Sequence, residues 1–140
     1  MTKNIDSPNS ILERKLVREL ETATKDLFWF SESEYPFKVV CWSNKDFSTD
    51  ALLQRYNYPP QTKIVVKDWQ SFFANAIEEK DWYNETEIAE TKRYQNLVNL
   101  ITQNLKTIRV YLLGEVEIDV YILGETESAI VGLTTKVVAT

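Results

Sequence analysis

Hydrophobic residues near the start of the chain recur at the spacing of a helix. Between positions 11 and 27 they lie mostly three or four residues apart, at Ile11, Leu12, Leu16, Val17, Leu20, Ala23 and Leu27. This period predicts an amphipathic helix over Ile11–Asp26, and Ser10 with Glu13 has the spacing of a capping box at its start. Pro36 excludes helix at the end of the loop that follows.

Further helices are predicted from their capping residues. Ser48 precedes a short apolar pattern that ends at Arg55, and Asp68 precedes a segment rich in Trp and Phe. Asn84 and Glu87 form a second capping box, after which apolar residues continue at helical spacing to Leu105. The segment after Asn84 is therefore predicted to be a long helix.

The remaining apolar segments have the character of strands. Lys38–Trp42 and Ile64–Val66 are rich in β-branched residues, and the second is predicted to be a buried strand. In the last third of the chain the period becomes two, which predicts strands at Arg109–Leu112, Glu115–Ile122 and Ala129–Val138. Because only short turns separate these three strands, we expect an antiparallel meander.

The order of the predicted elements indicates the fold class. Helices dominate the first two-thirds of the sequence and strands the last third, which is typical of an α+β fold with a mainly antiparallel sheet covered by helices. The pattern gives little evidence on whether helices cover one face or both. The 140 residues suit one domain. We expect a flexible polar N-terminus over residues 1–9 and a single domain over residues 10–140.

Composition restricts the partners and the compartment. The net charge of −5 disfavours direct binding of nucleic acid and favours a basic protein partner, although a modest negative charge also serves solubility. Cys41 is the only cysteine and lies in an apolar run, so we expect a buried, inert thiol and no internal disulfide. The chain shows no signal-peptide pattern and no apolar run long enough to span a membrane, so we expect a cytoplasmic protein.

The absence of histidine is the strongest restriction on chemistry. It excludes Ser-His-Asp and Cys-His catalysis and histidine zinc sites. Carboxylates remain: Glu115, Glu117 and Asp119 are predicted to share one face of a strand, because side chains alternate. They could bind a divalent cation or act as an acid–base pair, as in a carboxylate-based, metal-dependent hydrolase. A solvated face of an antiparallel sheet explains them more simply.

Two other features are candidates for contact with a partner. Glu32 and Glu34 lie in a short loop, Ser31-Glu32-Ser33-Glu34-Tyr35-Pro36, where they are either solvated or touch a partner. Trp82 lies in Asp81-Trp82-Tyr83 between two predicted helices. It is either an exposed interface anchor or part of a small core.

These segments together resemble the nuclease A inhibitor family, small bacterial proteins that inhibit a sugar-non-specific DNA/RNA endonuclease of the ββα-metal type. The resemblance covers nearly the whole chain and is strongest from about Leu97 to Thr140. It rests on the Ser-Glu-Ser-Glu loop, on Asp81-Trp82-Tyr83, on Leu113-Gly114-Glu115-Val116-Glu117-Ile118-Asp119-Val120-Tyr121 and on the ending Thr135-Lys136-Val137-Val138-Ala139-Thr140.

The resemblance implies both a fold and a set of contact residues. The fold would be an α/β/α sandwich similar to that of pathogenesis-related-1 proteins. Glu32, beside Glu34, would contact the active site of the nuclease, and Trp82 would lie in the interface. Thr140 would reach the catalytic magnesium of the nuclease. Ala139 departs from the family, which has an acidic residue before the final Thr.

The resemblance thus implies an inhibitor that blocks a magnesium-dependent nuclease with an acidic loop and its last residue. Such a protein is not an enzyme and needs no cofactor of its own, because the magnesium belongs to the nuclease. Two alternatives stay open from the sequence. One is an interaction module for a partner that is not a nuclease, and the other is the metal-dependent hydrolase described above.

Overall fold

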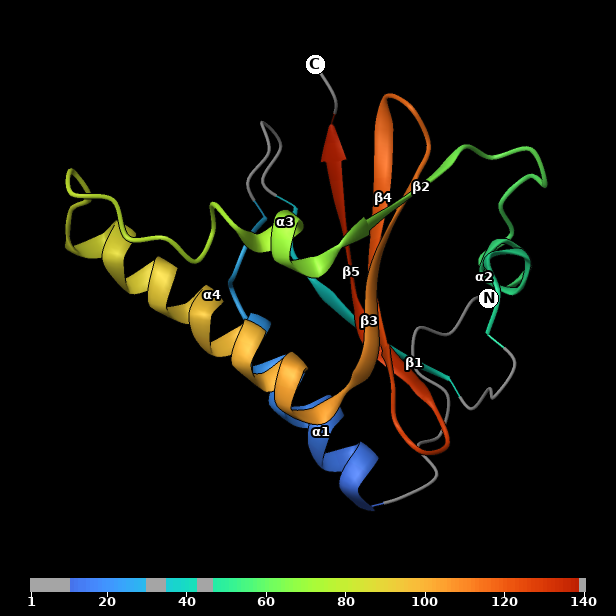
Figure 1. The fold of residues 1–140 in the computed structure, drawn as a ribbon, viewed down its shortest axis with the longest axis horizontal. Coiled ribbons are helices and arrows are strands. Elements are labelled where there is room, and N and C mark those ends of the chain that lie inside the picture. The colour runs from blue at the N-terminus through green and yellow to red at the C-terminus, as the bar shows by residue number, and fades with distance from the viewer. Residues whose placement is uncertain (1–10, 30–34, 43–46, 139–140) are drawn as a thin grey trace.

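A five-stranded sheet lies between two layers of helices in the computed structural model, which describes residues 11–29, 35–42 and 47–138 (Figure 1). The elements follow the chain as α1 (Ile11–Thr24), β1 (Lys38–Trp42), α2 (Thr49–Arg55), β2 (Ile64–Asp68), α3 (Trp69–Phe73), α4 (Glu85–Asn104), β3 (Lys106–Leu113), β4 (Glu117–Glu125) and β5 (Ile130–Val138). The predicted helices and strands are all confirmed, with shifts of a few residues at their ends.

The sheet is antiparallel throughout, with the strand order β1-β5-β4-β3-β2. The last three strands form the predicted meander. β1 pairs with β5, so that Lys38 lies opposite Thr134, and β2 pairs with β3, so that Ile64 lies opposite Leu113. The two strands from the first half of the chain therefore form the two edges of the sheet.

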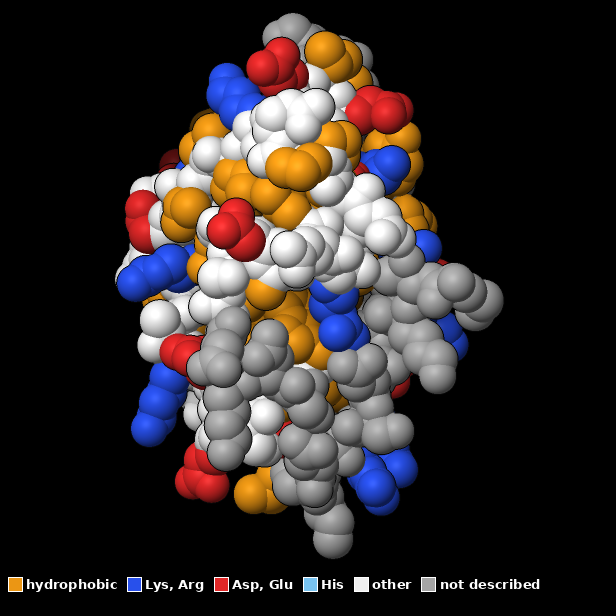
Figure 2. All heavy atoms as spheres, turned by 90° about the vertical axis from the view of Figure 1, so that its right-hand side faces the viewer, with side chains coloured by type: hydrophobic (Ala, Val, Ile, Leu, Met, Phe, Trp, Pro, Cys, Tyr) orange, Lys and Arg blue, Asp and Glu red, His pale blue; other side chains and the backbone are white. Residues whose placement is uncertain are grey.

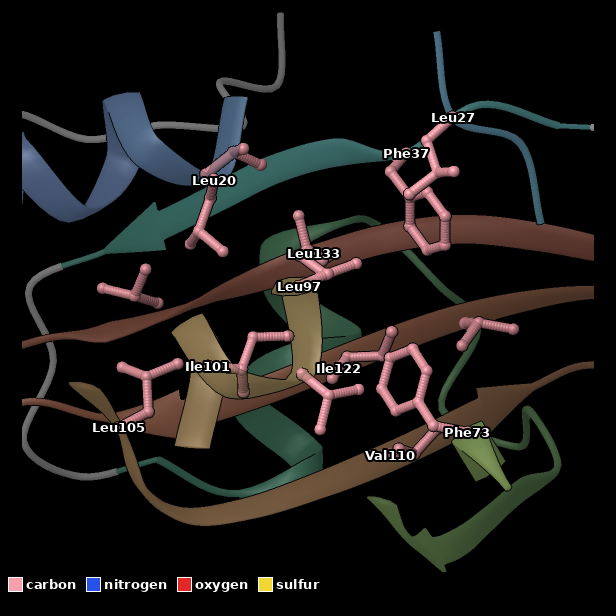
Figure 3. Close-up of a cluster of buried hydrophobic side chains, with 14 of the residues drawn as sticks. Leu20, Leu27, Phe37, Phe73, Leu97, Ile101, Leu105, Val110, Ile122 and Leu133 are labelled. Atoms are coloured by element: carbon pink, nitrogen blue, oxygen red, sulfur yellow. The ribbon is translucent and has the colours of Figure 1, made fainter. Parts of the chain in front are cut away.

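The larger core lies on the face of the sheet that α1, α3 and α4 cover (Figure 1). Leu20 of α1 and Leu97 and Ile101 of α4 point toward Ile122 and Leu133 of the sheet (Figure 3). All five side chains are buried. Because strand side chains alternate, every second residue of each central strand points into this core.

A smaller core lies on the opposite face, under α2. Leu52 and Leu53 of α2 pack with Val40 and Trp42 of β1 and with Tyr121 of β4. Figure 2 shows this side of the molecule, where apolar side chains lie between polar ones. Helices on both faces establish the α/β/α arrangement and the α+β class. The similarity to pathogenesis-related-1 proteins stays a prediction.

The prediction of a buried strand at Ile64–Val66 is wrong in its burial. β2 forms as predicted, but Val65 is 40% exposed and Val66 is 51% exposed. A short apolar run has the same appearance in a central strand and at an edge. Here β2 is the edge strand that pairs with β3 at one end of the described sheet, and its two valines stay in contact with water.

The predicted capping residues differ in their outcome. Ser48 and Asp68 cap α2 and α3 as predicted. Ser10 lies outside the described residues. Glu13 is buried, and its carboxylate accepts hydrogen bonds of 2.7 Å from the hydroxyls of Thr126 and Ser128. These bonds join the first turn of α1 to the turn between β4 and β5.

The capping box of α4 is confirmed and can be tested. The Asn84 side chain accepts from the Glu87 amide at 2.8 Å, and the Glu87 carboxylate accepts from the Asn84 amide at 3.1 Å. Asn84→Ala leaves the Glu87 amide without its side-chain acceptor, so we expect the free energy of unfolding to fall by about 1 kcal/mol. Urea denaturation measures this. Thr86→Ala, in the same exposed turn, is the control and should change stability little.

Candidate partner-binding edge

Of the four predicted contact residues, Trp82 is the one that the structure describes. Glu32, Glu34 and Thr140 lie outside the described residues, as does Ala139. The Trp82 side chain is 77% exposed, in the segment between α3 and α4, and its ring meets Tyr83 edge to face at 6.2 Å. Trp82 therefore belongs to no core, which removes one of the two interpretations that the sequence left open.

The two ends of the acidic loop are held together by the backbone. The Trp29 amide donates to the Tyr35 carbonyl at 3.0 Å, and Phe28 pairs with Pro36 in an isolated antiparallel bridge. The Tyr94 hydroxyl of α4 donates to the Phe28 carbonyl. The segment that carries Glu32 and Glu34 thus begins after Trp29 and ends before Tyr35, two residues that a backbone hydrogen bond holds together.

Aromatic packing holds the first of these residues in place. The Trp29 ring is buried and stacks on Phe72 of α3, with ring centroids 4.4 Å apart. It meets Phe73 and Tyr94 edge to face, each at 5.6 Å. Aromatic contacts of this kind stabilise beyond their buried area. Through Phe72, the loop is linked to the helix after which the Trp82 segment begins.

The other end of the loop lies against the last strand. The Thr135 hydroxyl of β5 is close to two carbonyl oxygens, that of Pro36 at 3.0 Å and that of Tyr35 at 3.3 Å. The Lys136 ammonium lies 5.9 Å from the centre of the Tyr35 ring, a cation–π distance. The strand that leads to Thr140 is therefore joined to the loop that carries Glu32.

Lys136 also joins this edge to β4. Its ammonium lies 3.8 Å from one oxygen of the Asp119 carboxylate, whose other oxygen accepts a hydrogen bond from the Tyr58 hydroxyl. The hydroxyls of Tyr58 and Tyr121 are 2.9 Å apart. A hydroxyl has one hydrogen, and Tyr58 gives its hydrogen to Asp119, so Tyr121 is the donor to Tyr58.

Both tyrosines of this chain of hydrogen bonds are neutral at physiological pH. Burial is the main reason that the pKa of Tyr58 is raised far above its usual range, and the hydrogen bond to Asp119 raises it further. Burial also raises the pKa of Tyr121 to about 12. Neither hydroxyl can therefore act as a base near neutral pH, and the arrangement orients Asp119 toward Lys136.

Of the three carboxylates predicted on one strand face, Glu117 and Asp119 share a face of β4 and Glu115 does not lie on the strand. Glu115 lies in the turn before β4, Glu117 is the exposed first residue of β4, and Asp119 is half-buried against Tyr58. Farther along the same face, Tyr121 and Leu123 pack under α2, so the face is not solvated along its length. Within residues 11–29, 35–42 and 47–138, no group of three acidic or cysteine side chains is arranged to hold a metal ion.

Cys41 agrees with its prediction as a buried thiol in β1. No local pattern in the sequence predicts the contacts of Thr135 and Lys136 with the loop. These residues lie about a hundred positions from Tyr35 and Pro36, and only strand pairing brings them together.

Among the described residues, no helix is both long and apolar enough to cross a membrane.

Comparison with known families decides the identity of the chain. The model of the nuclease A inhibitor-like protein family matches residues 14–140. The chain belongs to this family. Membership of the nuclease A inhibitor-like family indicates an inhibitor of a nuclease rather than an enzyme, and therefore a nuclease as the partner. No curated protein matches the chain significantly.

Proposed function

We propose that this protein inhibits a magnesium-dependent, sugar-non-specific ββα-metal nuclease by blocking its active site. The acidic loop with Glu32 and Glu34 enters the cleft, Thr140 approaches the catalytic magnesium, and Trp82 anchors the interface beside it. The protein acts in the cytoplasm of the producing cell and protects nucleic acids there. This family member supplies positioned groups and no catalytic residue.

One observation carries the proposal: the Thr135 hydroxyl bonds to the carbonyl oxygens at the end of the acidic loop. Thr135 lies five positions before Thr140, and Tyr35 directly follows Glu34. The structure thus joins the bases of the two segments that the family resemblance assigns to one active site. Two segments at opposite ends of the molecule could not enter the same cleft.

The chemistry of a nuclease cleft suits these groups. Such a cleft binds anionic phosphate beside a hard cation, and magnesium prefers oxygen ligands. Carboxylates of the loop and oxygen atoms of Thr140 are ligands of this type. The magnesium is held by the nuclease, and this chain adds oxygen atoms to it. A net charge of −5 favours the approach to a basic cleft and raises the association rate at low salt.

The buried contacts at the base of the loop reduce the cost of binding. Trp29 and Thr135 are buried, so the ends of the loop are ordered before the partner arrives. A loop whose two ends are held in place loses less conformational entropy in the complex than a loop whose ends are free. We therefore expect Thr135, which holds the end of the loop, to affect inhibition without touching the nuclease itself.

Thr135→Val tests the link between β5 and the loop. Valine keeps the shape of threonine but removes the hydroxyl that donates to Pro36 or Tyr35. We expect the free energy of unfolding to fall by about 1 kcal/mol and inhibition to weaken several-fold, because the loop is held less firmly. Inhibition titrations with purified nuclease measure the second effect.

The control is Thr102→Val on α4, where the hydroxyl bonds back to the Val98 carbonyl at 2.9 Å within the helix. It makes the same chemical change far from the loop and should leave inhibition unaltered. Equal inhibition constants for the two variants would refute the link.

Competition with substrate tests the proposed function itself. A short oligonucleotide and this protein should exclude each other on a ββα-metal nuclease made inactive at its catalytic base. Fluorescence anisotropy of a labelled oligonucleotide should fall to the value of the free strand as the protein is added. A ternary complex, in which anisotropy stays high, would rule out occupation of the active site.

A further inference from the structure

The turn between β3 and β4 presents an exposed apolar side chain between two acidic ones. Val116 is 68% exposed, and Glu115 and Glu117 on either side are exposed as well. Among the large hydrophobic side chains that the structure describes, only Leu12 and Trp82 are more exposed. Single exposed valines are common on protein surfaces, so exposure alone does not indicate a contact residue. Whether Val116 contacts a partner has to be judged from its position in the fold.

The turn lies next to the end of the last strand. Glu117 is paired with Val138 across the β4–β5 ladder, and Val138 is two residues before Thr140. In Figure 1 the turn and the end of β5 lie together at the top of the sheet. At the upper end of the face in Figure 2, hydrophobic and acidic side chains lie side by side. The turn thus lies beside the strand that leads to Thr140, the residue proposed to approach the magnesium of the nuclease.

The turn is also held rigidly. Gly114 has φ of +111°, and its amide donates to the Lys63 carbonyl at 3.0 Å, which ties the turn to the residue before β2. A Cβ atom at Gly114 would lie 2.6 Å from the Glu117 carbonyl oxygen, so only glycine fits this tight turn. The backbone of the turn is therefore held in place, so that less backbone entropy is lost when a partner binds the turn.

Glu115 and Glu117 form no ion pair with any of the described residues. Nearby Asp119 has Lys136 as its partner, whereas these two carboxylates face solvent. Two exposed carboxylates on either side of an exposed apolar side chain are complementary to a partner surface that is basic and has an apolar depression. The rim of a cleft that binds nucleic acid is basic, because it has to neutralise phosphates.

The geometry points to the β3–β4 turn as a further contact element for the nuclease, with Val116 packed on the rim of its cleft and Glu115 and Glu117 facing basic side chains there. This inference rests on the proposed function and extends the inhibitory edge beyond the loop, Trp82 and Thr140. The turn supplies affinity through Val116 and association rate through its two carboxylates.

The first test measures contact and affinity at position 116. A photo-crosslinking residue placed there should bond covalently to an inactive ββα-metal nuclease encoded in the same genome, whereas the same residue at position 12 should not. Val116→Arg should raise the Kd of that complex by about tenfold or more, because a long charged side chain displaces the packed valine. Leu12→Arg is the matched control on α1, since Leu12 is 78% exposed, and should bind as the unaltered protein does.

The second test distinguishes the effect of the two turn carboxylates on the association rate from the effect of the net charge of the protein. Glu115→Gln with Glu117→Gln should slow association several-fold at low salt, and the difference should vanish at high salt. Glu19→Gln with Glu21→Gln removes the same charge from exposed positions of α1 and should slow association less.

The outcomes distinguish this inference from the proposed function. If the unaltered protein binds the nuclease while Val116→Arg binds equally well and position 116 gives no crosslink, the contact is refuted and the proposed function stands. If the unaltered protein does not bind the nuclease, the proposed function and the contact both fail. Crosslinking at position 116 with weaker binding by Val116→Arg supports both.

Discussion

Glu32→Ala combined with removal of Thr140 should abolish inhibition at protein concentrations where the unaltered chain inhibits completely. Loss of a charged partner from a buried interface costs about 2–5 kcal/mol, so Glu32→Ala alone should raise the inhibition constant by about 30-fold or more. Removal of Thr140 takes oxygen atoms away from the magnesium of the nuclease. Because both changes affect one cleft, their effects are not expected to add.

The control for Glu32→Ala is Glu21→Ala, which changes the net charge equally at an exposed position of α1. It should inhibit as the unaltered protein does. The melting temperatures of all variants should agree within a few degrees, since the contacts that hold the loop are made by Trp29, Tyr35 and Thr135. Full inhibition by the double variant would show that the inhibitory residues lie elsewhere.

Trp82→Ala is the second large effect that we expect. Truncation of a Trp at the centre of an interface costs about 2–4 kcal/mol, which corresponds to about 30- to 1000-fold in affinity. Trp82 contacts no core, so the loss should appear in binding while the stability of the free protein is kept. Surface plasmon resonance should show faster dissociation with little change in association.

Leu12→Ala is the matched control, because its side chain is as exposed as that of Trp82 but lies at the start of α1. Trp82→Phe should bind with intermediate affinity, since phenylalanine keeps part of the apolar area. An unchanged dissociation rate for Trp82→Ala would place the anchor of the interface on another residue.

The features that the sequence predicted well depend on neighbouring residues. The capping box at Asn84 and Glu87 joins residues three positions apart, and the alternation in β4 and β5 is a property of each strand. Trp82 could be named as a candidate because it lies between two helices that local signals delimit. A hydrophobic period or a helix cap can be recognised from residues close together in the sequence, without knowledge of the rest of the fold.

The features that the sequence did not predict depend on residues far apart in the chain. The exposure of Val65 and Val66 follows from the place of β2 at the edge of the sheet, which no local pattern specifies. The bonds from Thr135 to the loop and the contact of Lys136 with Asp119 arise only once β5 lies between β1 and β4. The base of the proposed site is therefore a product of strand order.

Ala139 gives a reason to expect a distinct target. It replaces the acidic residue that the family resemblance implies next to the final Thr, so the proposed site carries one negative charge fewer beside the magnesium. Glu117, the pairing partner of Val138, and Glu115, two residues before it, add negative charge near the same end of the sheet.

Titration of a ββα-metal nuclease, at a concentration well above the expected Kd, with the intact protein measures inhibition directly. Cleavage of DNA and RNA should fall linearly and reach zero at one equivalent of protein. Undiminished cleavage of both substrates in the presence of a large excess of folded protein would show that this protein does not inhibit such a nuclease.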